Sequence, residues 1–199
     1  MSEDFTDPIF IQPDLRPVLT VGRGIFKKQI YLLMEDWEYI WDANGKRYRM
    51  LFKRGIVTDI ASVPRILWAI IPPDGDQRAA ALPHDELYQY QGKLPKGRIF
   101  SWKDEKWNDI SDCHWSRKDS DKFLANILDA AGSSKLKRRM MYLGVRIGGW
   151  YPWMKQYPPL LSQERIAYLL RQYDKGRLRN VPEVVEAEKA ESQKQDPIL

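Results

Sequence analysis

The chain has 199 residues, of which 43% are hydrophobic and 30% are charged, a composition typical of a globular protein with a core of its own. A single cysteine, Cys113, excludes an internal disulfide framework and is typical of a reducing compartment or of a disulfide-free virion. No apolar run approaches the length of a membrane-spanning helix, about 18 residues, and the acidic start predicts that no signal peptide directs secretion.

The net charge of +5 is distributed unevenly along the chain. Residues 180–199 carry a net charge of −3, so residues 1–179 carry +8. A basic body favours anionic partners such as lipid head groups or nucleic acid, although a basic surface without a specific partner is the commoner explanation. The last segment is polar and acidic, and we expect a flexible tail over 180–199 unless a partner orders it.

The first part of the chain predicts β-structure after an irregular start. Residues 1–24 are rich in Pro and Gly and predict an N-terminal arm with a short strand at Val18–Val21. Residues 25–58 are rich in β-branched and aromatic side chains, and Asn44-Gly45 in their middle is the strongest short signal for a hairpin turn. We therefore expect a β-hairpin or small meander over 25–58.

Two segments after the hairpin have open interpretations. Ser62 is a good N-cap and predicts a helix over Arg65–Ile71, with Asp59 just before it as a turn or capping residue. Residues 93–111 read as an inserted, exposed hairpin. Its aromatic side chains either steady the hairpin or form a contact surface; they are Phe100, Trp102 and Trp107.

The stretch from Gly75 to Tyr90 contains His84, one of only two histidines. In a helix, His84 has apolar neighbours one turn before it and one turn after it, so it faces the core. Because burying a titratable group without a partner is costly, His84 needs a partner. Pro83 either kinks this helix or opens it, and Gly92 ends it.

A carboxylate lies on the apolar face of the next helix. Ser116 is its N-cap, Gly132 ends it, and Asp121 shares a face with Leu124 and Leu128. A further helix over Lys135–Trp153 is basic at its start, and we expect its apolar side chains to face inward; they are Leu136, Met140, Leu143, Ile147 and Tyr151. A last helix begins after Ser162 and runs through Tyr173.

These elements predict an α+β fold, in which a small antiparallel β-hairpin or meander packs on a bundle of three to four helices. We expect a single domain over 25–179, with 93–111 as an insertion. The arm (1–24) and the tail (180–199) lie outside that domain.

The ionisable groups at buried or capping positions suggest two kinds of role. An imidazole hydrogen-bonded to a carboxylate is held in one tautomer and becomes a better base, and Asp85 beside it can bind a hard cation such as Ca²⁺. Together these groups suit base-activated attack of water on an ester or phosphoester. The alternative is a buried histidine that only clamps the structure. Nucleophile-elbow, phosphate-loop and paired-histidine metal motifs are absent from the sequence.

Five ordered motifs within residues 45–153 carry a resemblance. They are Gly55-x-x-Thr58-Asp59-x-Ala61-Ser62-x-Pro64-Arg65, Pro72-Pro73-x-Gly75, Arg78-Ala79-Ala80-x-x-x-His84-Asp85-x-x-Tyr88, Ser116-Arg117-x-x-x-Asp121 and Met141-Tyr142-x-x-Val145-Arg146-x-x-Gly149-Trp150. The series resembles an uncharacterised family of small proteins encoded by tailed phages and prophages. That resemblance implies a virion component or a protein of the infected cell, with other virion proteins as partners, and it assigns no activity.

A second resemblance concerns the two site helices. Asp76-x-x-Ala79-Ala80-x-x-x-His84-Asp85-x-x-Tyr88 and Ser120-Asp121-x-x-Leu124 are similar to the active-site helices of phospholipase A2. The resemblance implies that His84 is the base, Asp85 a calcium ligand, and Asp121 with Tyr88 the groups that orient the base. Asp59 is a second candidate ligand. The calcium loop of that family, Tyr-x-Gly-x-Gly, does not precede the helix here.

From these observations we expect a virion-associated tail or capsid component with a buried His–Asp clamp. The alternative is a calcium-dependent hydrolase of an ester or phosphoester. Both interpretations require the helices of His84 and Asp121 to pack together, with a hydrogen bond between the two side chains. A structure with these residues on opposite sides of the domain would contradict both.

Overall fold

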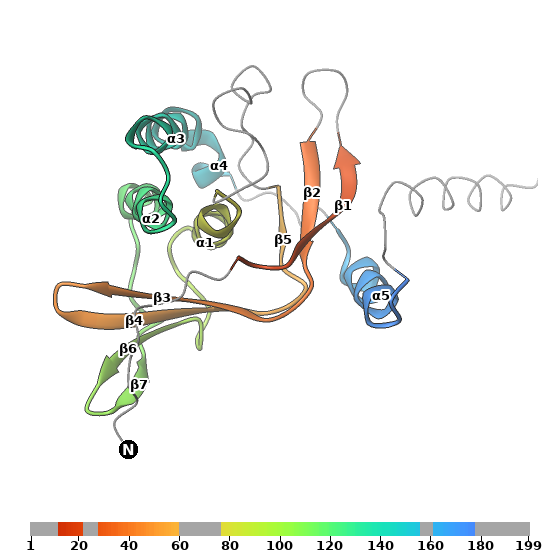
Figure 1. Ribbon diagram of the computed structural model, residues 1–199, viewed down its shortest axis with the longest axis horizontal. Coiled ribbons are helices and arrows are strands. Elements are labelled where there is room, and N and C mark those ends of the chain that lie inside the picture. Colours follow the sequence, from red (N-terminus) through yellow and green to blue (C-terminus); the bar gives the residue numbers. More distant parts are fainter. Residues whose placement is uncertain (1–11, 22–27, 60–76, 156–160, 178–199) are drawn as a thin grey trace, which may run out of the picture.

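The computed structural model describes residues 12–21, 28–59, 77–155 and 161–177 (Figure 1). Within these ranges the chain forms two antiparallel sheets and five helices, an α+β fold that confirms the predicted class. The helix predicted over Arg65–Ile71 lies outside the described residues, as do the tail and most of the N-terminal arm.

The strands form two separate sheets. The first has the order β1-β2-β5, from strands β1 (Leu15–Val21), β2 (Lys28–Leu33) and β5 (Val57–Thr58). The second has the order β3-β4-β6-β7, from strands β3 (Trp37–Ala43), β4 (Lys46–Phe52), β6 (Ile99–Lys103) and β7 (Lys106–Asp109). The predicted meander over 25–58 is therefore divided between two sheets, and β1 is longer than the short strand expected at Val18–Val21.

The helices are α1 (Gln77–Gln89), α2 (Arg117–Ala130), α3 (Lys135–Gly148), α4 (Trp150–Met154) and α5 (Gln163–Asp174). In Figure 1, α1 and α2 lie over the second sheet, α3 and α4 lie on the far side of α1 and α2, and α5 lies beside the first sheet. The sheet and the outer helices thus enclose α1 and α2, which carry His84 and Asp121.

Local signals set several of these elements. Asn44 and Gly45 both have positive φ, 55° and 69°, as the tight turn between β3 and β4 requires. The Ser116 side chain accepts a hydrogen bond from the Asp119 backbone amide and so caps α2 as predicted. Pro83 lies inside α1, which neither begins nor ends there.

The 93–111 segment is a hairpin, as predicted, but it is part of the second sheet. β6 pairs with β4, so the hairpin adds two strands to the edge that β4 would otherwise expose. The guanidinium of Arg49 lies 5.1 Å from the Phe100 ring centroid and 4.5 Å from that of Trp107. These contacts support the interpretation that the aromatic side chains steady the hairpin.

The prediction for the third helix was wrong in two respects. Gly149 separates α3 from α4, and four of the five predicted inward side chains face solvent, with Leu136 65% exposed and Ile147 81% exposed. Only Met140 packs against the main core as predicted. The opposite side of α3 faces the protein, where Met141 is buried and Arg146 reaches Asp121. A periodic apolar stripe reveals a face but not which way the face points, and the ion pair of Arg146 turns the other side inward.

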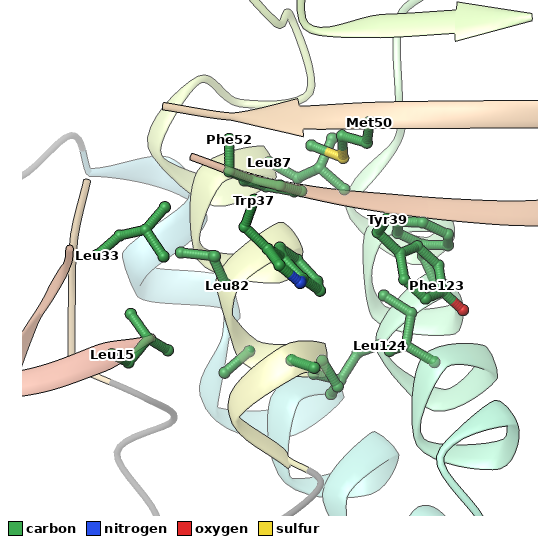
Figure 2. Close-up of a cluster of buried hydrophobic side chains, with 14 of the residues drawn as sticks. Leu15, Leu33, Trp37, Tyr39, Met50, Phe52, Leu82, Leu87, Phe123 and Leu124 are labelled. Carbon is green, nitrogen blue, oxygen red and sulfur yellow. The ribbon is translucent and has the colours of Figure 1, made fainter. Parts of the chain in front are cut away.

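The main core lies between the second sheet and α1 and α2. Figure 2 shows Trp37, Tyr39 and Phe52 of the sheet pointing toward side chains of α1 and α2. The rings of Trp41 and Phe123 are 4.7 Å apart, which joins the sheet to α2. A second cluster packs β1 and β2 against α5 through Val18, Ile30, Leu32, Ile166 and Leu169. Apolar side chains buried on one face of each sheet thus pack α1 and α2 against the second sheet and α5 against the first.

We predict that Gly92→Ala destabilises the protein strongly. Gly92 follows α1 with φ of 75°, and an added Cβ would overlap the backbone carbonyl of Trp115, whose amide donates to the Gly92 carbonyl at 2.9 Å. We expect a loss of about 3 kcal/mol in the free energy of unfolding, measured by urea denaturation. Gly97→Ala is the matched control: its φ is 79° with open space around the added Cβ, so it should cost only about 1 kcal/mol. Equal losses would contradict the proposed clash.

Candidate functional site

His84 and Asp121 form a buried hydrogen bond between α1 and α2. The His84 Nε2 atom lies 3.0 Å from Oδ1 of Asp121, and the two residues are 7% and 0% exposed. The two helices pack against each other. Both the helix packing and the hydrogen bond predicted from the sequence are therefore confirmed.

Asp121 accepts hydrogen bonds from α1 and α3 and has a further cation beside it on α2. The Tyr88 hydroxyl of α1 donates to Oδ1 at 2.6 Å, and Nη1 of Arg146 in α3 donates to Oδ2 at 2.7 Å. Nη1 of Arg117, one turn earlier in α2, lies 3.7 Å from Oδ2. Burial raises the pKa of Asp121, but the hydrogen bonds from His84, Tyr88 and Arg146 outweigh burial and leave that pKa lowered. The carboxylate is therefore held in its ionised form.

The other ring nitrogen of His84 faces Asp85. Nδ1 lies 3.7 Å from Oδ1 of Asp85, while the Thr58 hydroxyl donates to Oδ2 of the same carboxylate. Burial alone lowers the pKa of His84, but the contacts with Asp121 and Asp85 outweigh it and raise that pKa. Each ring nitrogen faces a carboxylate, an arrangement that favours the imidazolium, in which both nitrogens carry protons.

Asp85 is the most exposed carboxylate of the network. Its side chain is 27% exposed, against 0% for Asp121. Burial and the charge of Asp59 raise the pKa of Asp85, with His84 and Thr58 acting in the opposite direction. Asp59 follows Thr58 directly, so the end of β5 brings a second carboxylate toward Asp85.

The structure brings together four of the predicted site residues in one hydrogen-bonded or charge-paired chain: His84, Asp85, Tyr88 and Asp121. Asp59 is linked to this chain by its charge on Asp85. Among the described residues, no three His, Cys, Asp or Glu side chains form a group that could hold a metal ion. A cation at Asp85 and Asp59 would therefore need further oxygen ligands of another kind.

Sequence reasoning missed four contributors to this site, although all four stand in the quoted motifs of the sequence: Thr58, Arg117, Arg146 and Gly149. Arg146 is 25 residues from Asp121 along the chain, and only the inward turn of α3 brings them together. Gly149 has no side chain, and a Cβ there would overlap the Tyr88 hydroxyl, so this glycine leaves room for Tyr88 to reach Asp121. Thr58 belongs to a motif of the sequence, but its hydrogen bond to Asp85 has no local signal. The approach of Arg117 to Asp121 did have a local signal, because Arg117 precedes Asp121 by four residues in the same helix.

A further buried acid lies two residues after His84 in the sequence. Glu86 is 2% exposed, and Nε of Arg98 is 3.3 Å from its Oε1 without hydrogen-bond geometry. Neither carboxylate oxygen of Glu86 has a hydrogen-bond partner. Burial raises the pKa of Glu86 to about 7, against the charge of Arg98. Glu86 faces Arg98, which directly precedes β6, and no hydrogen bond of its carboxylate joins it to the His84 network.

Residues 31–145, more than half of the chain, match the family model described as Protein of unknown function (DUF1353). The chain belongs to this family. The match confirms the expectation of an uncharacterised family and covers His84, Asp85 and Asp121, while Arg146 directly follows it. Searches of curated proteins and of solved structures found no match to this DUF1353 member. No helix among the described residues is long and apolar enough to cross a membrane.

We predict that Asp121→Asn costs about 3–5 kcal/mol in the free energy of unfolding, because it leaves His84 and Arg146 without the buried negative charge that pairs with them. Urea denaturation measures the loss. Asp129→Asn is the matched control on the same helix. The Asp129 side chain is 64% exposed and pairs with Arg138, so its loss should stay within about 1 kcal/mol. A small loss in Asp121→Asn would contradict a structural role for the network.

We predict that Glu86→Gln changes how stability depends on pH. Because the pKa of Glu86 is raised to about 7 in the folded protein, the folded state binds more protons than the unfolded state above pH about 4.5. Stability should therefore fall by about 2–3 kcal/mol between pH 5 and 8, and Glu86→Gln should remove this part of the fall. The raised pKa of His84 adds a loss in the same direction above pH about 6.5.

Urea denaturation at several pH values measures this effect. Glu38→Gln is the control, since the Glu38 side chain is 51% exposed and lies 3.8 Å from Arg49 in a surface ion pair. The control should keep the pH dependence of the wild type. If Glu86→Gln also kept it, the protonation of Glu86 would not contribute.

Proposed function

We propose that this DUF1353 protein is a phage or prophage protein that acts as a non-catalytic component or accessory of the virion. In this role the Asp121 network is a structural clamp. The observation that carries the proposal is the position of His84, whose two ring nitrogens lie 3.0 Å and 3.7 Å from carboxylate oxygens. A general base needs a neutral nitrogen directed at water or substrate, and an imidazolium between two carboxylates lacks one.

The phage setting rests on the five ordered motifs of the sequence, which resemble proteins of tailed phages and prophages. Family membership supports the part of that resemblance that concerns an uncharacterised family, because the matched range contains the motifs of β5, α1 and α2. Other virion proteins are the expected partners, in the particle or in the host cytoplasm. Mass spectrometry of purified particles tests this setting: the chain should be present in stoichiometric amounts, and its absence would contradict a virion role.

A second candidate function is hydrolysis of an ester or phosphoester, as in phospholipase A2. One observation favours it: Nδ1 of His84 is 3.7 Å from Asp85, too far for a direct hydrogen bond, so a neutral Nδ1 could accept a proton from water. Nε2 would then keep its proton and donate it to Asp121, which Tyr88 also orients. A Ca²⁺ ion held by Asp85, with Asp59 as a further ligand, would polarise the ester group.

We predict that His84→Ala and Asp85→Asn lower the stability of the protein. Neither variant should remove an enzymatic activity, because the proposed function is non-catalytic. Loss of the imidazole leaves Asp121 with one donor fewer in a buried site, so the cost should be about 1–3 kcal/mol in thermal or urea unfolding. His114→Ala is the control, because His114 is exposed and lies outside the network. Its stability should match that of the wild type.

The same three proteins separate the two functions. The non-catalytic function predicts no turnover of a panel of phospholipids and phosphoesters, and no rise in melting temperature with Ca²⁺. Turnover that is lost in His84→Ala but kept in His114→Ala would establish the hydrolase instead. A Ca²⁺-dependent rise in melting temperature that disappears in Asp85→Asn would point the same way.

A further inference from the structure

The exposed large hydrophobic side chains of this protein are concentrated on one surface. Six of the seven among the described residues belong to α3 and α4, and Tyr168 on α5 is the seventh. We call these six the α3–α4 surface: Leu136 (65% exposed), Leu143 (46%), Ile147 (81%), Trp150 (61%), Tyr151 (51%) and Met154 (64%). Scattered apolar side chains are normal on a protein surface, but such a concentration in 19 consecutive residues (136–154) marks a binding surface.

The spacing of these residues makes the surface continuous along α3. Leu143 and Ile147 follow Leu136 at intervals of seven and four residues, so all three lie on one face of the helix. Gly144 and Gly148 lie beside this face, and a Cβ at either would have no atom within 4 Å. The described part of the chain therefore leaves this face uncovered.

The surface is also strongly basic. Residues 135–155 contain six basic side chains and no acidic one; the basic ones are Lys135, Lys137, Arg138, Arg139, Arg146 and Lys155. Arg146 and Arg138 are directed toward the protein, where they pair with Asp121 and Asp129. Lys135 and Arg139 are exposed at the edge of the apolar face.

We propose that the α3–α4 surface binds the surface of an anionic lipid bilayer. An apolar face with cations along its edge, together with Trp and Tyr, is the pattern of a helix that lies in the head-group region of a membrane. The apolar side chains enter the boundary of the acyl chains, and the cations contact lipid phosphates. At 14 residues, α3 is too short to span a bilayer, which takes about 20 residues, so it lies along the membrane plane.

Charge and shape favour a lipid surface over the other occupants. In a symmetric dimer through this surface, the cations of both copies would meet without an acidic partner from this segment. A nucleic acid would satisfy the cations but would leave the ridge of Leu143 and Ile147 without apolar contact. The inference holds whether or not His84 is catalytic, because none of the six apolar side chains belongs to its network.

Co-flotation of the full chain with vesicles tests the proposal. We expect binding to vesicles of phosphatidylcholine mixed with phosphatidylglycerol, and binding at least about tenfold weaker to phosphatidylcholine alone. The double variant Leu143→Ser/Ile147→Ser should lose about tenfold or more of the affinity for anionic vesicles. Lys135→Glu/Arg139→Glu should lose a comparable factor, and the loss should shrink as salt screens the charges.

Matched variants outside the surface control for changes in hydrophobicity and charge. Tyr168→Ser removes the exposed aromatic side chain of α5, and Lys118→Glu/Lys122→Glu makes the same change of charge on the exposed side of α2. The Tyr168 variant should bind vesicles as the wild type does, and the α2 variant should retain more affinity than Lys135→Glu/Arg139→Glu. All variants should keep the melting temperature within a few degrees, because the changed side chains are exposed.

Three results would overturn the proposal. One is failure of the wild-type chain to bind either kind of vesicle. Another is equal binding by the wild type and by Leu143→Ser/Ile147→Ser. The third is evidence for a different occupant of the surface. Sedimentation could reveal a dimer of the wild type that the double variant does not form. Alternatively, the wild type could bind a nucleic-acid duplex more tightly than vesicles, with an affinity that the double variant leaves unchanged.

Discussion

A single buried carboxylate holds the helical half of this protein together. Asp121 is fully buried, so its charge is tolerated only if donors surround it. The donors come from two helices, His84 and Tyr88 from α1 and Arg146 from α3, and Arg117 of α2 itself adds a positive charge 3.7 Å away. None of these elements can shift without leaving the fully buried Asp121 carboxylate with fewer partners. The network therefore sets the relative positions of α1, α2 and α3.

This constraint also determines what the protein exposes. Because Arg146 must reach Asp121, the side of α3 that carries Arg146 and Met141 faces inward, and the side that carries Leu136 and Ile147 faces solvent. Gly149, at the junction with α4, has no side chain where the Tyr88 hydroxyl approaches. The buried site and the apolar outer surface are thus two consequences of the same ion pair.

Sequence reasoning succeeded where the signal was local. The Asn44-Gly45 turn, the Ser116 cap and the core-facing positions of His84 and Asp121 follow from a few neighbouring residues. It failed where partners are distant in sequence. Nothing near β6 announces its pairing with β4, and nothing near α3 announces that Arg146 will pair with Asp121. The apolar stripe of α3 was found, but its direction depends on that ion pair.

Whether the network is a clamp or a catalytic site depends on the proton of His84. With both nitrogens protonated, the imidazolium balances Asp121 on one side and Asp85 on the other, and no basic nitrogen remains. A divalent cation at Asp85 would change this balance, because its charge would replace that of the imidazolium and lower the pKa of His84. Nδ1 could then accept a proton from water, while Asp121 kept the ring in place. Cation binding and general-base activity are therefore linked in this geometry: the second cannot arise without something that displaces the proton.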